Sequence, residues 1–476
     1  MKVCVLQPDY STSGVDYQNY DPARDLSRLL PGDEVLHVSL NKLTTYKQLR
    51  DLNKQNFDVF VNLCEGYLEW EVPSIDVIHT LELLNLPFTG PSSKLYDPTK
   101  ELMKYVAYCV GVNTPGYVRI EKPEDVKTAS QLLKYPLFVK PAKAGDSLGI
   151  DEHSKVSNEL ELLQKVNEII EEYGPLLVEE YIDGREFTVL VAANADGKTC
   201  TAFKPVEYIF PEGRSFKTYA LKTSELHPDA NIPCNDPVLE KNLREAAKKI
   251  FLGFQGVGYS RLDFRVDASG KIYFLEINFT CSVFYQDGYE GSADFILKFD
   301  GIGQAGFLNH MIAEGIARHQ RKKKCYEMRG NSIAGYGIYA ARDIAKGEVV
   351  FKGEGRSQRI ITKRHVEKYW NEEEKLDFRR YAYPISEEVF ILWDEEPSEW
   401  APQNHSCEAN TSFDGLDVRA LRDVKSGEEL TLNYAHFLDH NMEPFQCRCG
   451  SSNCKKLISG PEANSLNLRE QGLREK

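Results

Sequence analysis

The pattern of apolar runs changes near residue 320, and this change most constrains how the chain can fold. Up to about Gln320, short apolar runs such as KVCVL, FDVFVNL and PLLVEEYI alternate with helical stretches such as SNELELLQKVNEIIEEY. This alternation is typical of α/β proteins with mixed sheets. Beyond the basic stretch RHQRKKK, short strands and polar, glycine-containing turns predominate. We therefore predict a multidomain α/β (α+β) chain with a β-rich second part, and interpret the basic stretch as a solvated linker rather than a nuclear address.

Length, charge and cysteine usage narrow the class of protein. A chain of 476 residues exceeds what one hydrophobic core usually organises, so two or three domains are expected. The formal charge of -14 argues against general nucleic-acid binding, which normally needs a basic excess. No apolar run approaches the roughly 20 residues that span a bilayer, and Pro8 and Asp9 interrupt the opening segment before a signal peptide forms. The scattered cysteines predict reduced thiols, and we expect a cytoplasmic protein without membrane contact.

The segment YSRLDFRVDASGKIYFLEINF places charged side chains on two neighbouring strands joined by the turn DASG. Strand alternation sends Arg261 and Asp263 to one face, and likewise sends Glu276 and Asn278 to one face. If the turn sets a symmetric register, the two faces coincide. Their oxygens then form a cage suited to Mg²⁺, with Arg261 beside it to stabilise developing charge. A purely structural salt-bridge cluster is the alternative.

Two earlier segments offer groups for a nucleotide. In FVKPAKAGDSLGI, residues 138–150, a strand precedes a glycine-containing loop whose backbone N–H groups can approach phosphate oxygens; a plain surface turn is the alternative. In LLVEEYIDGREFTVLV, acidic residues at a turn can accept hydrogen bonds from adenine and ribose, and a hairpin with solvated acids is the alternative.

Together these segments resemble the ATP-grasp superfamily, and specifically the D-alanine:D-alanine ligases, over most of residues 1–320. The resemblance implies that a carboxylate attacks the γ-phosphate of ATP and that an amine captures the acyl phosphate. It implies Arg261 as the residue that stabilises the transferring group, and Asp263, Glu276 and Asn278 as magnesium ligands. The nucleotide-contacting residues that it implies are Lys100, Lys140, Gly145, Ser147, Glu179, Tyr181, Ile182, Glu186 and Lys222.

Two segments depart from the pattern of that family. The glycine-rich first turn is replaced by QPDYSTSGVDY, and the residues after Asn278 read FTCSVFYQDGYEGS instead of the usual Pro-Gly-Met turn. Both positions bear on the substrate. We therefore expect ligation of an amino acid or peptide rather than of D-alanine.

Four cysteines crowd into the last seventy or so residues. Cys447, Cys449 and Cys454 have a CxCxxxxC spacing that lets thiolates from one loop converge on a tetrahedral metal, and Cys407 is the candidate fourth ligand. Unpaired structural cysteines are the alternative. We predict a structural Zn²⁺, because four thiolates leave no open coordination position.

Three stretches ahead of these cysteines are GYGIYAARDIAKGE, NHSCEAN and EELTLNY. In this order they resemble SET-domain methyltransferases with a post-SET zinc segment, over residues 327 to about 458. The resemblance implies that Tyr434 lies where a methyl group passes from S-adenosylmethionine to a lysine. It implies Gly335, Tyr336, Gly337, Asn404 and His405 as contacts of S-adenosylmethionine, although His405 alone would more often be structural. Tyr381 or Tyr383 is expected either to line the lysine channel or to pack in a core.

These resemblances predict an ATP-grasp fold followed by a β-rich, pseudoknotted SET domain. The predicted parts are an N-terminal α/β subdomain (1–95), a nucleotide-binding and catalytic region (96–320), a linker (321–326), a SET domain (327–445), a post-SET segment (446–458) and a flexible tail (459–476). The expected function is a carboxylate–amine ligase plus a lysine methyltransferase that acts on a peptide or protein, with a homodimer as the assembly considered. In the alternative, the SET part is an active lysine methyltransferase and the ATP-grasp half only binds nucleotide or peptide. A SET part that merely binds peptide is a third hypothesis.

Overall fold

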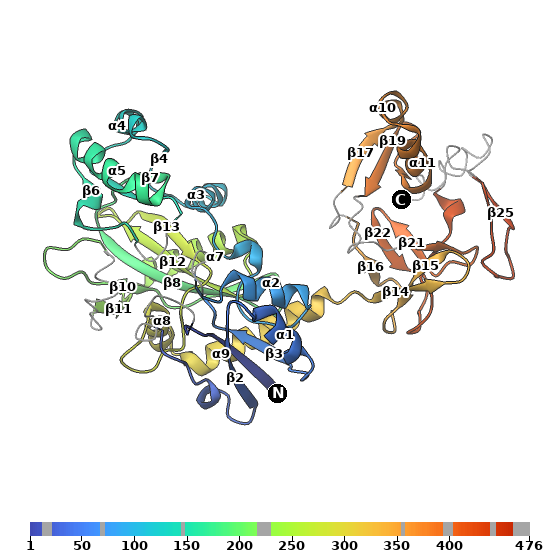
Figure 1. Ribbon diagram of the computed structural model, residues 1–476, viewed down its shortest axis with the longest axis horizontal. Helices are drawn as coiled ribbons and strands as arrows, with labels where there is room; N and C mark the ends of the chain where they lie inside the picture. The colour runs from blue at the N-terminus through green and yellow to red at the C-terminus, as the bar shows by residue number, and fades with distance from the viewer. Residues whose placement is uncertain are drawn as a thin grey trace. The chain divides into compact units, whose positions relative to one another are not determined.

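The computed structural model describes residues 1–11, 21–66, 72–143, 148–216, 230–353, 358–393, 403–437 and 444–459 (Figure 1). The chain forms two compact units, residues 1–321 and 322–476. The first is mixed α/β and the second is rich in short strands, as the sequence predicted. Among the described residues, no helix combines the length and the apolar content needed to cross a bilayer.

The first unit begins with a small parallel sheet in the order β2-β1-β3. The middle strand β1 is a continuous buried apolar run, which is usual for a parallel strand covered on both faces. The carboxyl ends of β1 and β3 lie at the same edge of the sheet because the two strands are parallel. The elements are β1 (Lys2–Pro8), β2 (Glu34–Leu40), α1 (Thr45–Asn53), β3 (Val59–Asn62) and α2 (Ile75–Leu83).

A second, antiparallel sheet has the order β4-β7-β5-β6, and two helices cover it (Figure 1). The helix α5 begins after Asn158, whose side chain accepts a hydrogen bond from the backbone N–H of Glu161, and it ends at Gly174 with φ of 68°. Its apolar face packs on the sheet through Leu162, Val166 and Ile169. The elements are β4 (Tyr117–Ile120), α4 (Val126–Leu132), β5 (Leu137–Pro141), β6 (Lys155–Val156), α5 (Glu159–Tyr173) and β7 (Leu176–Glu180).

The third sheet is built on two long neighbouring strands, β8 and β12, and has the order β11-β10-β8-β12-β13 with β9 beside β8. Both long strands are almost wholly buried, which makes this sheet the rigid centre of the first unit. Its elements and surrounding helices are α3 (Lys100–Cys109), β8 (Arg185–Ala193), β9 (Cys200–Ala202), β10 (Val206–Tyr208), β11 (Asn231–Pro233), α7 (Pro237–Gly253), β12 (Tyr259–Val266), β13 (Ile272–Asn278), α8 (Ser292–Asp300) and α9 (Gly303–Lys322).

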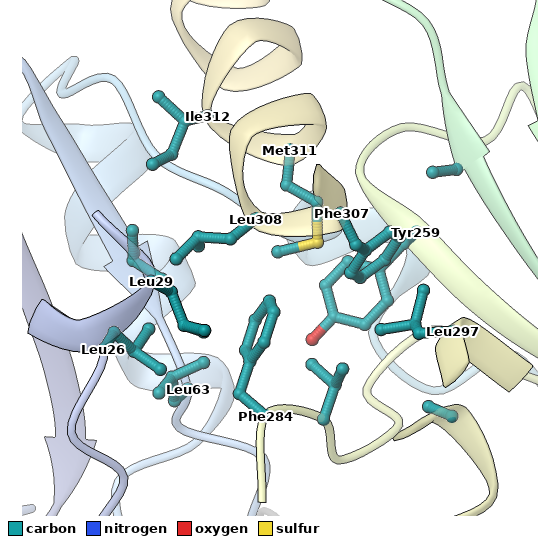
Figure 2. Packing of buried hydrophobic residues seen from close by; sticks show 14 of the residues in the cluster. Leu26, Leu29, Leu63, Tyr259, Phe284, Leu297, Phe307, Leu308, Met311 and Ile312 are labelled. Atoms are coloured by element: carbon teal, nitrogen blue, oxygen red, sulfur yellow. The ribbon is translucent and has the colours of Figure 1, made fainter. Parts of the chain in front are cut away.

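An apolar core joins the parallel sheet to the third sheet (Figure 2). Phe307 and Met311, one turn apart on α9, are both fully buried in it. The Phe307 ring packs edge to face on Tyr259 of β12, with the ring centres 5.6 Å apart. Leu26 and Leu63, which follow β1 and β3, belong to the same cluster. This core fixes the ends of β1 and β3 against the start of β12.

The basic stretch RHQRKKK is not simply a solvated linker, because α9 continues through it to Lys322. Arg318 is buried and donates to the backbone carbonyls of Gly90 and Phe88 at 2.9 and 2.6 Å. It also lies 3.6 Å from Glu314, one turn earlier. The sequence interpretation was wrong here because fixed backbone acceptors, absent from any local pattern, bury this cation.

The second unit consists of short antiparallel pairs and triplets, with one short parallel pair between β20 and β23. An apolar cluster that includes Ile338, Val418 and Leu430 forms its core. The elements are β14 (Tyr326–Asn331), β15 (Gly335–Ala340), β16 (Val349–Phe351), β17 (Gln358–Thr362), α10 (Lys363–Tyr369), α11 (Glu372–Tyr381), β18 (Tyr383–Pro384), β19 (Val389–Trp393), β20 (Asn404–His405), β21 (Thr411–Asp414), β22 (Asp417–Ala420), β23 (Thr431–Leu432), β24 (Phe445–Gln446) and β25 (Leu457–Ile458).

We predict that Phe307→Ala destabilises the first unit by about 3–5 kcal/mol, because it removes a fully buried ring and leaves a cavity. Urea unfolding followed by hydrogen exchange of the β12 amides reports on this unit alone. Tyr108→Ala removes an aromatic ring that is 79% exposed and should cost about 0.5 kcal/mol or less. Equal losses in the two variants would contradict the packing described for α9.

Candidate functional site

The register of β12 and β13 gathers four polar side chains on one face of the third sheet. Asp263 pairs with Glu276, and Arg261 pairs with Asn278. Side chains of directly paired residues lie on the same face of an antiparallel sheet. The turn between the strands is held by Asp267, whose carboxylate accepts hydrogen bonds from the backbone N–H groups of Ser269 and Lys271. The faces expected from the sequence therefore coincide, but not through a symmetric register: a β-bulge between Asp263 and Phe264 shifts the pairing by one residue and brings Asp263 opposite Glu276.

This face has the chemistry of a site for a hard cation. Two carboxylates and an amide supply oxygen ligands of the kind that Mg²⁺ prefers. Asp263 is 9% exposed, and its Oδ1 atom accepts no hydrogen bond from any described residue. A buried acceptor without a donor normally costs free energy, and a bound cation would remove that cost. The donor set therefore fits magnesium, although the ligand roles remain predictions.

Arg261 lies beside these oxygens, with its Nη2 atom 3.3 Å from Asp263 Oδ2. Burial lowers the pKa of Arg261, but the neighbouring Asp263 and Glu276 carboxylates outweigh burial and raise the pKa above its ordinary value. The guanidinium is therefore a permanent cation at this face. Its position suits the stabilisation of negative charge on a transferring group.

Three buried lysines and one buried glutamate lie at the base of the second sheet. Glu179 of β7 contacts Lys140 of β5 at 2.9 Å and Lys104 of α3 at 2.6 Å. Burial opposes ionisation of Glu179, but the two lysines outweigh it and hold its pKa below the ordinary value. Lys100, one turn before Lys104, is also buried, and burial lowers its pKa. Lys100 and Lys140, which were predicted to contact the nucleotide, thus lie in the same cluster of buried charges as Glu179.

The sequence reasoning missed Lys104, although a signal was present. Lys100, Met103, Lys104 and Ala107 are the buried residues of α3, and they follow the spacing of one helical face. Two lysines on the apolar face of an amphipathic helix indicate buried partners, because an unpaired buried ammonium is too costly. That pattern could have identified Lys104.

The segment that was predicted to contact adenine and ribose is held by Arg265, a second residue that the sequence reasoning missed. Arg265 lies opposite Glu186 in the register of β12 and β8, and its Nη2 atom is 2.9 Å from Glu186 Oε2. Its Nη1 atom donates to the Tyr181 hydroxyl at 3.0 Å and to the Ile182 carbonyl at 3.2 Å. One guanidinium therefore fixes three of the predicted contact residues. The other predicted contacts Gly145, Ser147 and Lys222 lie outside the described residues.

In the second unit, the four predicted zinc ligands meet. The sulfur atoms of Cys407, Cys447, Cys449 and Cys454 all lie within 4.8 Å of one another. The backbone N–H of Lys455 donates to Cys407 Sγ at 3.3 Å, and the backbone N–H of Cys449 donates to Cys447 Sγ at 3.5 Å. Such N–H donors stabilise thiolates. Four sulfur ligands at this spacing fit a tetrahedral zinc ion, and the metal itself remains a prediction.

Three predicted segments meet around Asn404: the glycine motif of residues 335–337, NHSCEAN and EELTLNY. Its Nδ2 atom donates to the backbone carbonyl of Tyr336 at 2.9 Å and to Glu429 Oε1 at 2.7 Å. A Cβ atom on Gly337 would overlap the Glu429 carboxylate and would lie 2.7 Å from Asn404 Nδ2. Gly335 has a φ of 84°, which favours glycine. Asn404 thus joins the glycine motif to Glu429, a residue that the sequence reasoning did not single out.

Tyr434 and the thiol cluster are connected through His405. The backbone N–H of Tyr434 donates to His405 Nδ1 at 3.1 Å, and His405 Nε2 lies 3.4 Å from Cys407 Sγ. Burial lowers the pKa of His405, so the ring is neutral and Nδ1 is a good acceptor. The Tyr434 hydroxyl donates to the Gln403 carbonyl, and burial raises its pKa to about 12. The phenol therefore stays protonated at neutral pH.

The two tyrosines named for the lysine channel differ in their surroundings. Tyr383 packs on Phe413 and Phe437, with ring centres 4.8 and 5.9 Å apart, and Phe437 also contacts Tyr434. Tyr381 is 56% exposed. Tyr383 is therefore the one that joins the aromatic group next to Tyr434.

Comparisons with known proteins agree with the division of the chain into two units. Residues 106–283 match the model of the D-ala D-ala ligase C-terminus, and residues 335–435 match the SET domain. The chain is 32% identical over 207 residues to D-alanine–D-alanine ligase B of Clostridium tetani, covering 41% of this chain and 56% of the relative. It is 30% identical over 201 residues to the D-alanine–D-alanine ligase of Aquifex aeolicus, and this match covers 42% of this chain and 64% of the relative. The chain thus spans about 56% to 64% of the length of these relatives.

A solved structure, the VanG D-Ala:D-Ser ligase from Enterococcus faecalis, aligns with 66% of this chain and 99% of its own, with 19% identity and a TM-score of 0.49. By the family models and the sequence relatives, the chain combines a region similar to the D-alanine–D-alanine ligases with a region that matches the SET domain. Both resemblances drawn from the sequence are confirmed.

We predict that the purified protein contains about one zinc ion per chain, because four thiols supply one complete tetrahedral shell. Atomic absorption measures the zinc. In Cys407→Ser the zinc content should fall to less than about a tenth, because a hydroxyl is a poor substitute for a thiolate. Cys109→Ser, at an exposed cysteine of the first unit, should keep the full content. A wild-type protein without zinc would contradict the assignment.

Proposed function

We propose that the chain is a bifunctional enzyme that joins a carboxylate to an amine at the expense of ATP in its first unit and methylates a lysine in its second. The observation that carries the ligase half is the shared face of Arg261, Asp263, Glu276 and Asn278, close to the buried Lys100 and Lys140. The similarity to D-alanine–D-alanine ligases over residues 106–283 supports it.

In the proposed ligase half, positioning and charge neutralisation do most of the work. Asp263, Glu276 and Asn278 would hold magnesium, which when bound neutralises the phosphates of ATP. Lys100 and Lys140 add positive charge. The Glu179 carboxylate contacts both Lys104 and Lys140 and so restricts the movement of these two ammonium groups. Arg261 would stabilise the negative charge that develops as the carboxylate substrate accepts the phosphoryl group. The substrate class is an amino acid or peptide.

We expect Asp263→Asn to reduce substrate-dependent ADP release by about 100-fold or more, because it removes one charged metal ligand without changing the size of the side chain. The assay contains ATP, Mg²⁺ and pooled amino acids and peptides. Asp267→Asn, four residues along, keeps the acceptor oxygen that holds the turn and should remain active.

If the wild type releases no ADP with any substrate, the first unit is a binding module and the ligase half of the proposal is wrong. If Asp263→Asn and Asp267→Asn are equally active, the metal role of Asp263 is wrong. Nucleotide binding can be measured separately, so that loss of catalysis is distinguished from loss of ATP affinity.

The observation that carries the methyltransferase half is the convergence of Asn404, the glycine motif and Tyr434 in one region. Asn404, His405 and residues Gly335 to Gly337 would hold S-adenosylmethionine, which when bound supplies an electrophilic methyl group. Because the Tyr434 phenol is protonated, it serves as an oriented dipole rather than as a base. The aromatic group of Tyr383, Phe413 and Phe437 offers an apolar wall along which a lysine stem can lie.

Tyr434→Phe should lower methyl transfer from labelled S-adenosylmethionine to lysine-containing peptides by about 100-fold, because it removes a preorganised hydroxyl. Binding of S-adenosylmethionine, measured by calorimetry, should change little in the variant, since the implied cofactor contacts remain. Tyr369→Phe removes a hydroxyl at a position that is 64% exposed and serves as the control. Equal transfer by Tyr434→Phe and the wild type would exclude the proposed role of this hydroxyl.

A further inference from the structure

The buried side chain of Arg265 lies beside the face that carries the predicted magnesium ligands, and it is 4% exposed. In the uninterrupted register of β12 with β8, Asp263 pairs with Thr188 and Arg265 pairs with Glu186. Side chains alternate along a strand, so Arg265 shares the face of Asp263 and lies about 7 Å further along it. The predicted metal ligands and the predicted nucleotide contacts therefore follow one another along a single face of the third sheet.

Arg265 donates hydrogen bonds to three segments that are separate in the sequence. Its Nη2 atom donates to Glu186 Oε2 at the start of β8 at 2.9 Å, and to the Ser215 carbonyl after β10 at 2.6 Å. Its Nη1 atom donates to the Tyr181 hydroxyl and the Ile182 carbonyl, both after β7. A guanidinium presents its N–H groups in a rigid planar fork, so the positions of these acceptors are coupled to one another.

The segment after β10 is held against the segment after β7 by further contacts. The Tyr181 hydroxyl, which accepts from Arg265, donates to the Ser215 carbonyl at 2.9 Å. The Phe216 ring packs edge to face on Phe138, with the ring centres 5.1 Å apart, and its centre lies 6.3 Å from that of Tyr181. The contacts of Arg265 therefore fix an aromatic group as well as an acidic acceptor.

The Glu186 carboxylate depends on Arg265 for its charge and its orientation. The side chain of Glu186 is 10% exposed, and a carboxylate in such a place is costly without a nearby cation. Without Arg265, the carboxyl group would take up a proton or turn toward solvent, and either change would remove an oriented acceptor. An ionised carboxylate has about four acceptor positions, so Glu186 can bind a further donor while it contacts Arg265.

The neighbouring position on the same face carries a polar atom without a partner. The hydroxyl of Thr188, opposite Asp263, is buried and has no hydrogen-bond partner among the described residues. Buried polar atoms are usually paired in folded proteins. An unpaired hydroxyl beside the pair of Arg265 and Glu186 indicates that a polar ligand completes this face.

We propose that Arg265 is a positioning residue for the ribose of the bound nucleotide. It acts through Glu186, which it keeps ionised and oriented so that the carboxylate accepts a hydrogen bond from a ribose hydroxyl. The inference rests on the proposed ligase function, in which ATP is the nucleotide. A nucleotide that lacks the hydroxyl would leave the buried acceptor unpaired and would bind more weakly.

The experiment compares the binding of ADP, 2′-deoxy-ADP and 3′-deoxy-ADP to the full chain with Mg²⁺, measured by calorimetry. ADP carries the complete ribose and is not consumed during the measurement. In the wild type, at least one deoxy analogue should bind about tenfold more weakly than ADP, because it leaves an acceptor without a donor.

Arg265→Met keeps an unbranched side chain but removes the charge and the N–H donors. In this variant ADP should bind about tenfold more weakly, and its advantage over the deoxy analogue should fall to less than about threefold. Arg265→Lys keeps a cation near Glu186 and should retain more of the preference than Arg265→Met. A merely structural role would weaken all three nucleotides by the same factor and leave the preference unchanged.

Two further variants separate these effects from damage to the fold. The double variant Arg265→Met with Glu186→Met leaves no unpaired buried charge and should fold even if Arg265→Met alone does not. It should lack the preference, because the acceptor is gone. Arg185→Met removes the adjacent arginine, which points to the opposite face of β8, is 51% exposed and pairs with Glu207. This control should keep the wild-type preference.

The inference is overturned if no nucleotide binds, if the wild type binds all three equally, or if Arg265→Met or the double variant keeps the full preference. ADP release with ATP, Mg²⁺ and pooled substrates tests the ligase separately. A ribose preference without ADP release contradicts the proposed ligase function but supports the role of Arg265. ADP release without a ribose preference contradicts only the role of Arg265.

Discussion

The pairing of Asp263 with Glu276 across β12 and β13 is the constraint on which the ligase site depends. A slip of one residue would send Glu276 and Asn278 to the opposite face of the sheet, because side chains alternate with a period of two. The register set next to the turn would place Asp263 opposite Leu275, and a β-bulge between Asp263 and Phe264 shifts it by one residue, so that Asp263 lies opposite Glu276. Burial of β8 and β12 then makes the face rigid, so that the polar groups do not depend on a mobile loop for their positions.

Buried charges in this chain are balanced locally rather than by the solvent. Glu179 has two lysines, Glu186 has Arg265, and Asp21 has Arg24 and two hydroxyls. In each case a partner lies within ion-pair distance, which offsets the cost of burying a charge in a poorly solvated place. Asp263 Oδ1 is a buried oxygen that accepts no hydrogen bond from any described residue.

The sequence predicted those features that depend on local periodicity and spacing. The strand–turn–strand segment gave the shared face of Arg261, Asp263, Glu276 and Asn278, and the CxCxxxxC spacing with Cys407 gave the thiol cluster. Lys104 and Arg265 were missed because their partners come from other strands, so that only the folded chain brings the charges together. Arg24 was missed for the same reason, since its partners are 41 and 259 residues away in Glu65 and Val283. Arg318 was misread because backbone carbonyls carry no sequence signal.

The link from Cys407 through His405 to Tyr434 has a consequence for biosynthesis. The chain is synthesised from its N-terminus, so Cys407, His405 and Tyr434 are made before the other three thiols. Until those thiols are made, Cys407 is the only sulfur of the cluster beside the histidine that accepts the hydrogen bond from the Tyr434 backbone. The thiol cluster that adjoins Tyr434 through His405 therefore cannot be completed before Cys454 has been synthesised.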